Sequence, residues 1–235
     1  MTSGILSVVS TPIGNLKDIT LRALDVLGEA DFIICEDTRV TGNLLNHYGI
    51  KKELISFNAQ SESRKIQYIL SRLQSGEKCA LVSDAGTPTI SDPGVRMVSA
   101  AIRNGIRVDT IPGPVAAIAA LSISGLPTDS FVFEGFLPQK KGRQKKFKEL
   151  ANEERTIILY ESTYRIEKLL GEISEYMPER TIVVAREITK KFEETWRGTA
   201  KEILTGLPGK TIKGEFVVVI SPSGWSEEEN SVTEQ

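Results

Sequence analysis

Two acidic side chains and an arginine follow directly on a short apolar run of this sequence. The run is Phe-Ile-Ile-Cys at 32–35, and Glu36, Asp37 and Arg39 come after it. A carboxylate can accept a proton from a reacting hydroxyl group, and a guanidinium can bind a phosphate oxygen. A structural role is also open, since Asp37 or Thr38 could begin a helix as its N-cap, with an ion pair at the surface. Charges at the end of a buried strand more often serve a site than a core, so Glu36, Asp37 and Arg39 are the candidates for catalysis.

Two loops with few bulky side chains follow two other apolar runs. The first, Ser-Thr-Pro-Ile-Gly-Asn at 10–15, permits a tight turn that exposes backbone amides to a ligand, and an ordinary strand-to-helix turn explains it equally well. The second, at 83–94, is longer and richer in Gly, Pro, Asp and Ser than a simple connection needs. Ligands of parallel α/β sheets usually bind at the carboxyl ends of the strands, so both loops predict a binding site.

The segment at 140–148 carries six basic residues in nine. Such a run can neutralise the phosphates of a nucleic acid, and a solvated helix face explains it about as well. The formal net charge of −2 gives the whole protein no long-range attraction to phosphate, so any RNA contact depends on a local patch. The candidates for that contact are Lys140, Lys141, Arg143, Lys145 and Lys146.

Several other chemistries find no support in the sequence. Cys35 and Cys79 lie far apart within apolar runs, which predicts two core residues in a reducing compartment rather than a disulfide or a metal pair. His47, the only histidine, has no carboxylates or cysteines near it at metal-ligand spacing. We therefore expect no metal site and no serine–histidine or cysteine–histidine pair. A leader segment and a long apolar run are both missing, so we expect a cytoplasmic protein with no membrane partner.

Short apolar runs alternate with amphipathic segments through the first half of the chain. The predicted helices at 64–73 and 94–103 have apolar residues that recur every three or four positions. Buried strands that alternate with crossover helices are typical of a mostly parallel sheet. The predicted strands of this half are 5–9, 32–35, 53–57, 79–83 and 107–111.

The pattern begins again after Pro112-Gly113-Pro114 and a helix of small residues at 115–123. We therefore predict two α/β domains with mostly parallel sheets, at 1–113 and 114–222. The remaining residues, 223–235, are polar, acidic and without periodicity, which predicts a flexible tail. The second domain has predicted strands at 130–136, 156–162, 181–189 and 215–221, and predicted helices at 145–154 and 165–177.

Seven short motifs in a fixed order make the sequence recognisable. They are VSTPIGNLKDIT, EDTR, LVSDAGTPTISDPG, IPGPVAAIAALSISGLP, EGFLP, LYES and AREITK. Together they resemble the tetrapyrrole methylase family, and within it the branch that methylates ribosomal RNA. The resemblance spans residues 5–221.

This resemblance implies a class III methyltransferase fold of two α/β domains, a homodimer, and S-adenosyl-L-methionine as methyl donor in the cleft between the domains. By analogy, the donor-binding residues lie in the two loops and just after the proline turn. They are Pro12, Gly14, Asn15, Asp84, Ala85, Gly86, Thr87, Pro88, Val115 and Ala116, with the strand ends near Glu161, Ala185 and Phe216 as weaker candidates.

The implied reaction is 2'-O-methylation of a cytidine ribose in the 16S rRNA of the small ribosomal subunit. Glu36 or Asp37 would accept the hydroxyl proton and Arg39 would position a phosphate or ribose oxygen, with Glu134 and Glu161 as alternative acceptors. Methylation of a tetrapyrrole or another small molecule is the nearest alternative, because a fold does not fix a substrate. A non-enzymatic RNA-binding factor in ribosome assembly is the second. Many members of this branch continue beyond their last strand, and if that extension helps to hold the ribosome, we expect substrate binding here to be weaker or differently arranged.

Overall fold

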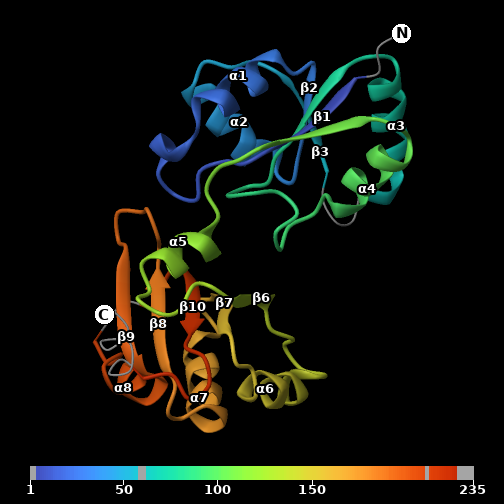
Figure 1. Cartoon of the computed structure of the whole chain (residues 1–235). Coiled ribbons are helices and arrows are strands. Elements are labelled where there is room, and N and C mark those ends of the chain that lie inside the picture. The colour runs from blue at the N-terminus through green and yellow to red at the C-terminus, as the bar shows by residue number, and fades with distance from the viewer. Residues whose placement is uncertain (1–3, 58–61, 210–211, 227–235) are drawn as a thin grey trace, which may run out of the picture. The chain divides into compact units, whose positions relative to one another are not determined.

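The computed structural model describes residues 4–57, 62–209 and 212–226. The chain divides into two compact units, the first ending at Val115 and the second beginning at Ala116 (Figure 1). Most of the predicted acidic tail, 223–235, lies outside the described residues. No helix of the described residues is long and apolar enough to cross a membrane.

The first unit contains a five-stranded sheet in the order β3-β2-β4-β1-β5, in which all neighbouring strands are parallel. All five predicted strands are present, so the prediction of a parallel sheet is confirmed for this unit. Its elements are β1 (Ile5–Val9), the 3-10 helix η1 (Leu16–Asp18), α1 (Leu21–Glu29), β2 (Phe32–Cys35), α2 (Thr38–His47), β3 (Glu53–Ser56), α3 (Glu62–Gln74), β4 (Lys78–Leu81), α4 (Val95–Arg103) and β5 (Arg107–Ile111).

Helices cover both faces of this first sheet, α1 and α2 on one side and α3 and α4 on the other (Figure 1). Successive side chains of a strand point to opposite faces, so Phe32 and Ile34 pack with α3 and α4, while Ile33 and Cys35 pack with α1 and α2. A strand with two buried faces must be apolar throughout, which explains the short runs in the sequence. Both cysteines are buried and unpaired, as predicted for core residues.

The second unit contains a mixed sheet in the order β6-β7-β10-β8-β9. Only β6 and β7 are parallel, and the other neighbouring pairs are antiparallel. The prediction of two α/β domains is confirmed, but the prediction of a mostly parallel sheet is wrong for this unit. Its elements are α5 (Ala116–Ser122), β6 (Phe131–Phe136), α6 (Arg143–Ala151), β7 (Thr156–Ser162), α7 (Ile166–Tyr176), β8 (Thr181–Arg186), β9 (Glu194–Thr199), α8 (Ala200–Thr205) and β10 (Glu215–Ile220).

One large apolar core joins α6, α7 and α8 to the second sheet. The core includes Phe147 of α6, Leu170 of α7 and Ile203 of α8, which contact strand residues such as Leu159 and Val218. Helix α5 lies apart from these helices in Figure 1 and contacts β7 and β10. The second sheet therefore carries its helices in two separate groups, and its strands β6 and β7 end at one common edge because they are parallel.

Candidate active site

The loops that follow β1 and β4 are joined to each other at the carboxyl edge of the first sheet. The Thr11 N–H donates to the Gly86 carbonyl at 2.8 Å, and the Gly86 N–H donates back to Thr11 at 3.0 Å. The Thr11 hydroxyl is buried and donates to the Ser83 carbonyl at 3.3 Å. Two loops far apart in the sequence are thus fixed in one arrangement, as expected for parts of a single site.

A chain of hydroxyl groups extends this connection to the proline turn after β5. The Thr87 Oγ1 donates to the Pro114 carbonyl at 3.1 Å and lies 2.7 Å from the Ser10 Oγ. A hydroxyl has only one proton to donate. Because Thr87 donates its proton to the Pro114 carbonyl, the Ser10 hydroxyl must be the donor in the hydrogen bond between Ser10 and Thr87. Gly113 permits this packing, because a Cβ at Gly113 would lie 2.8 Å from the Ser10 Cβ. Three loops therefore meet around Ser10 and Thr87.

The β2 loop joins the same edge through Asp84. The Asp84 Oδ1 accepts the Asp37 N–H at 3.0 Å, and the Asp37 side chain begins α2 as its N-cap by accepting the Arg39 N–H at 2.8 Å. The Arg39 side chain is exposed and lies 2.6 Å from the Asp37 carboxylate. The hydrogen bonds from Arg39 lower the pKa of Asp37 to about 2. The carboxylate of Asp37 is thus a weak proton acceptor. Its role as the N-cap of α2 is the structural alternative that the sequence indicated for this residue.

Glu36 has the opposite electrostatic character. Burial raises its pKa above the usual value, and the negative charges of Asp84, Asp92 and Asp37 raise it further. Burial also raises the pKa of Asp92, where a hydrogen bond with Ser83 opposes the effect. A carboxylate whose pKa is raised accepts protons more strongly, so Glu36 suits a general base better than Asp37. Among the residues that the structure describes, no group of histidine, cysteine or acidic side chains is arranged to hold a metal ion.

The long loop between β4 and α4 has a strained backbone. Thr89 has a φ of 74° and Ser91 a φ of 64°, values that non-glycine residues seldom adopt. Gly94, which begins α4, has a φ of 122°, and its missing side chain leaves room for Leu81. Strain of this kind persists only where the surroundings hold it in place, and it is concentrated at binding sites.

Replacement of Gly94 by alanine is expected to lower the free energy of unfolding by about 2 kcal/mol. The new Cβ would lie 2.9 Å from the Leu81 Cδ2 in addition to the unfavourable φ. Gly105→Ala is the matched control, because Gly105 follows the same helix with a φ of 69° and nothing within 4 Å of an added Cβ. Only the strain of about 1 kcal/mol should remain there. Urea unfolding measures both variants, and equal losses would rule out the steric contribution.

The other predicted donor-binding residues differ in exposure. Gly14, Asn15 and Ala85 are exposed, Pro12 and Pro88 are buried, and Val115 and Ala116 are half-buried. The Asn15 side chain begins η1 by accepting the Lys17 N–H at 3.1 Å. Among the predicted residues, Gly86 contacts the loop after β1, Thr87 contacts the turn after β5, and Asp84 contacts the residues after β2.

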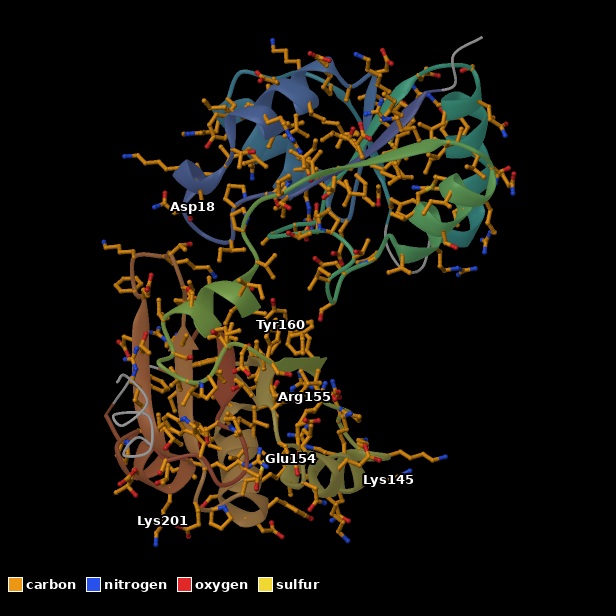
Figure 2. The ribbon with its side chains drawn as sticks, in the orientation of Figure 1. Asp18, Lys145, Glu154, Arg155, Tyr160 and Lys201 are labelled. Atoms are coloured by element: carbon orange, nitrogen blue, oxygen red, sulfur yellow. The ribbon has the colours of Figure 1, made fainter. Side chains whose placement is uncertain are left out.

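The basic segment of the second unit separates into exposed and bound side chains. Lys140, Lys141 and Lys145 are exposed, and Figure 2 shows Lys145 extending away from α6. Lys146 is half-buried and lies 2.7 Å from the Glu134 carboxylate. Arg143 is buried, and its guanidinium donates to the Glu172 carboxylate at 2.6 Å and to the Pro138 carbonyl at 3.0 Å. The exposed lysines are therefore the part of this segment that is open to a phosphate.

The two alternative proton acceptors, Glu134 and Glu161, each form an ion pair with a basic side chain. Glu134 is paired with Lys146, and the side chain of Glu161 is buried beside Arg165 at 2.8 Å. Sequence reasoning missed the buried hydroxyls of Ser10, Thr11 and Ser83, although their signal was present as serine and threonine directly after two buried strands.

Comparisons with known proteins add independent findings. Residues 6–204 match the model of the Tetrapyrrole (Corrin/Porphyrin) Methylases family. The Ribosomal RNA small subunit methyltransferase I of Thermotoga maritima is 47% identical over 218 residues, which are 93% of this chain and 98% of that protein.

Solved structures share the fold at low sequence identity. A diphthine synthase superposes with a TM-score of 0.72 at 18% sequence identity. The match covers 93% of this chain and 90% of the diphthine synthase chain. The Uroporphyrin-III C-methyl transferase from Thermus thermophilus, complexed with S-adenyl homocysteine, has a TM-score of 0.65 at 16% sequence identity. That match covers 93% of this chain and 97% of the transferase chain. At such identities the likeness concerns the fold alone.

Proposed function

This chain belongs to the tetrapyrrole methylase family, and we propose that it transfers a methyl group from S-adenosyl-L-methionine to the 2'-oxygen of a cytidine in 16S rRNA. The observation that carries the proposal is the 47% identity to a ribosomal RNA small subunit methyltransferase along almost the whole of both chains. The seven collinear motifs lie within the same region of the sequence.

The carboxyl edge of the first sheet fits the proposed donor. The donor carries a positive sulfonium and a positive ammonium group, and Glu36, Asp84 and Asp92 give this edge a negative charge. Gly14 and Ala85 are exposed and have little or no side chain, which lets a ligand approach the backbone there. A protein of the same fold was solved with S-adenyl homocysteine, which is what remains of the donor after methyl transfer.

The proposed chemistry is an in-line displacement. When bound, the donor supplies an electrophilic methyl group whose bond to sulfur breaks as the bond to the ribose oxygen forms. The chain then has two tasks, to align the oxygen with the methyl carbon and to take up the hydroxyl proton. We assign the proton to the Glu36 carboxylate and the positioning of a phosphate or ribose oxygen to Arg39, whose exposed guanidinium lies in the first turn of α2.

The direct test uses labelled S-adenosyl-L-methionine and small ribosomal subunits from a strain that lacks this gene. Nuclease digestion of the rRNA should then release the label as 2'-O-methylcytidine. Label in a tetrapyrrole or another small molecule, with none in RNA, would support the alternative substrate class. Donor binding without transfer to any acceptor would support a non-enzymatic RNA-binding factor.

We also propose that the chain acts as a homodimer. Helix α4 exposes Val95 and Ile102, which are seven residues apart and so lie on one side of the helix. Exposed apolar side chains aligned in this way are typical of a protein interface. Light scattering coupled to size-exclusion chromatography measures the mass in solution, and Val95→Asp should convert a dimer to monomers.

Reversing the charge of Lys141 and Lys145 together is expected to weaken binding of small-subunit RNA and to spare donor binding. The two exposed lysines each neutralise a phosphate in this proposal, so the slope of log affinity against log salt should fall by about one per lysine. The control is Lys201→Glu combined with Lys191→Glu, an equal change of charge on exposed residues. Figure 2 shows Lys201 on α8, away from Lys145. Filter binding at several salt concentrations gives the slopes, and equal slopes for the two double variants would exclude a local contact.

A further inference from the structure

An aromatic surface lies at the edge of the second sheet where β6 and β7 end. Phe136 is the last residue of β6 and is 51% exposed, and Tyr164, in the turn after β7, is 96% exposed. The two strands are parallel, so their ends share one edge. Neither ring is needed for the core at this exposure, and large exposed aromatic side chains at one edge of a sheet commonly mark a binding surface.

The buried side of the Phe136 ring is held by other aromatic side chains of the second sheet. Its ring packs against Tyr160 at 5.7 Å between centroids, and Tyr160 packs in turn against Phe133 at 5.0 Å. The Tyr160 hydroxyl accepts the Ala117 N–H at 3.1 Å, which ties this stack to the start of α5. Figure 2 shows Tyr160 beside α5. The exposed face of Phe136 therefore belongs to a ring whose position is already fixed before any partner binds.

Arg165 stands beside Phe136 with a fixed orientation. Its guanidinium carbon lies 5.9 Å from the centre of the Phe136 ring. Its Nε is 2.8 Å from the buried Glu161 carboxylate and 3.2 Å from the Ser162 Oγ. Within the described parts of the chain, the guanidinium makes one ion pair, with Glu161, and one hydrogen bond, to Ser162. Both contacts are made by Nε. The two terminal nitrogens remain available to an anion, in the forked geometry that suits a phosphate.

We propose that Phe136, Tyr164 and Arg165, the aromatic–arginine patch, bind one unpaired nucleotide of the RNA substrate. The base stacks on Phe136 or Tyr164, and the terminal nitrogens of Arg165 bind a phosphate of the same strand. Unpaired bases of RNA are commonly recognised by stacking on aromatic rings and on guanidinium planes. The inference rests on the proposed function, since it names the part of the chain that would receive the substrate.

Charge favours RNA over an apolar partner at this patch. The loop that follows Phe136 carries the exposed Lys140 and Lys141, and its Pro138 carbonyl is fixed by Arg143. An aromatic ring beside an arginine, followed in the chain by exposed lysines, matches a strand of stacked bases and phosphates. A hydrophobic partner would instead leave the exposed lysines without counterions.

The test compares Phe136→Ala, Tyr164→Ala and Arg165→Ala with Phe192→Ala. Phe192 is 63% exposed and lies outside the patch, so it is a matched control for loss of an exposed ring. The probe is rRNA from small subunits that lack the methylation, and the readouts are RNA affinity by filter binding, donor affinity by calorimetry and thermal midpoint. Each patch variant should lose about tenfold or more in RNA affinity with unchanged donor affinity. Phe136→Tyr and Arg165→Lys should recover part of the loss.

The outcomes separate this inference from the proposed function. Wild-type protein that methylates rRNA while all patch variants bind RNA as Phe192→Ala does would overturn the patch and leave the function intact. Weaker donor binding with unchanged RNA binding would assign the aromatic rings to the donor and also overturn the inference. Wild-type protein that fails to methylate rRNA would overturn the proposed function, while the RNA affinities still decide whether the patch binds a nucleotide.

Discussion

Replacement of Glu36 by glutamine is expected to lower the single-turnover rate of methyl transfer by about 10²-fold or more. The amide has the same shape as the carboxylate but cannot accept the ribose proton, so the affinities for donor and RNA should change little. Of the acidic side chains at the carboxyl edge, Glu36 combines partial burial with a raised pKa and a position directly after a buried strand. A rate within twofold of the wild type would remove Glu36 from this role.

The pH dependence of the rate gives a second test of Glu36. A general base is active when it is deprotonated, so the rate should rise with pH through the pKa of Glu36 and then level off. Burial and the charges of Asp84 and Asp92 raise this pKa, which places the rise above the range of an ordinary glutamate. In Glu36→Gln the rise should disappear and leave a low, flat profile. A profile unchanged in shape would show that another group titrates.

Asp37→Asn is the matched comparison on the same loop. Its pKa of about 2 keeps Asp37 charged at neutral pH, and its carboxylate is held by Arg39. Asparagine also caps a helix, so α2 should form as before. We expect the rate to fall by severalfold at most, and a loss equal to that of Glu36→Gln would transfer the role of proton acceptor to Asp37.

The first unit was predictable because its central strands β2 and β4 are buried on both faces. A run such as Phe-Ile-Ile-Cys has no polar position, so it fits a central parallel strand and little else. Loops that leave such strands then stand at one edge, which explains why Ser10, Thr87 and Pro114 come together from distant parts of the sequence. The hydrogen bonds themselves were not predictable, because they depend on the exact approach of three loops.

The second sheet was harder to predict for two physical reasons. Helices between β6, β7 and β8 indicated parallel crossovers, but β10 lies between β7 and β8 and is antiparallel to both. Strand direction there is decided by packing, which local patterns do not contain. Strand β9 was missed because its six residues, ETWRGT, include one buried side chain, Trp196, and an edge strand needs only one partner.

Replacement of Arg143 by alanine is expected to lower the free energy of unfolding by about 3 kcal/mol. The Arg143 side chain is 5% exposed, and its loss leaves the Glu172 carboxylate without its bidentate partner and the Pro138 carbonyl without its donor. The sequence did contain a sign of this role. Arg143, Phe147 and Leu150 recur at four and three positions, so they share the helix face that enters the core.

Lys145→Ala is the control for Arg143→Ala, because the Lys145 side chain is 84% exposed on the same helix. Its effect on unfolding should stay within about 0.5 kcal/mol, as is usual for exposed positions. In RNA binding the order should reverse, since Lys145 is open to a phosphate and Arg143 is held by Glu172. Urea unfolding and filter binding of both variants decide the matter. A stable Arg143→Ala protein with weakened RNA binding would mean that Arg143 releases Glu172 and contacts the RNA, as the basic run in the sequence first indicated.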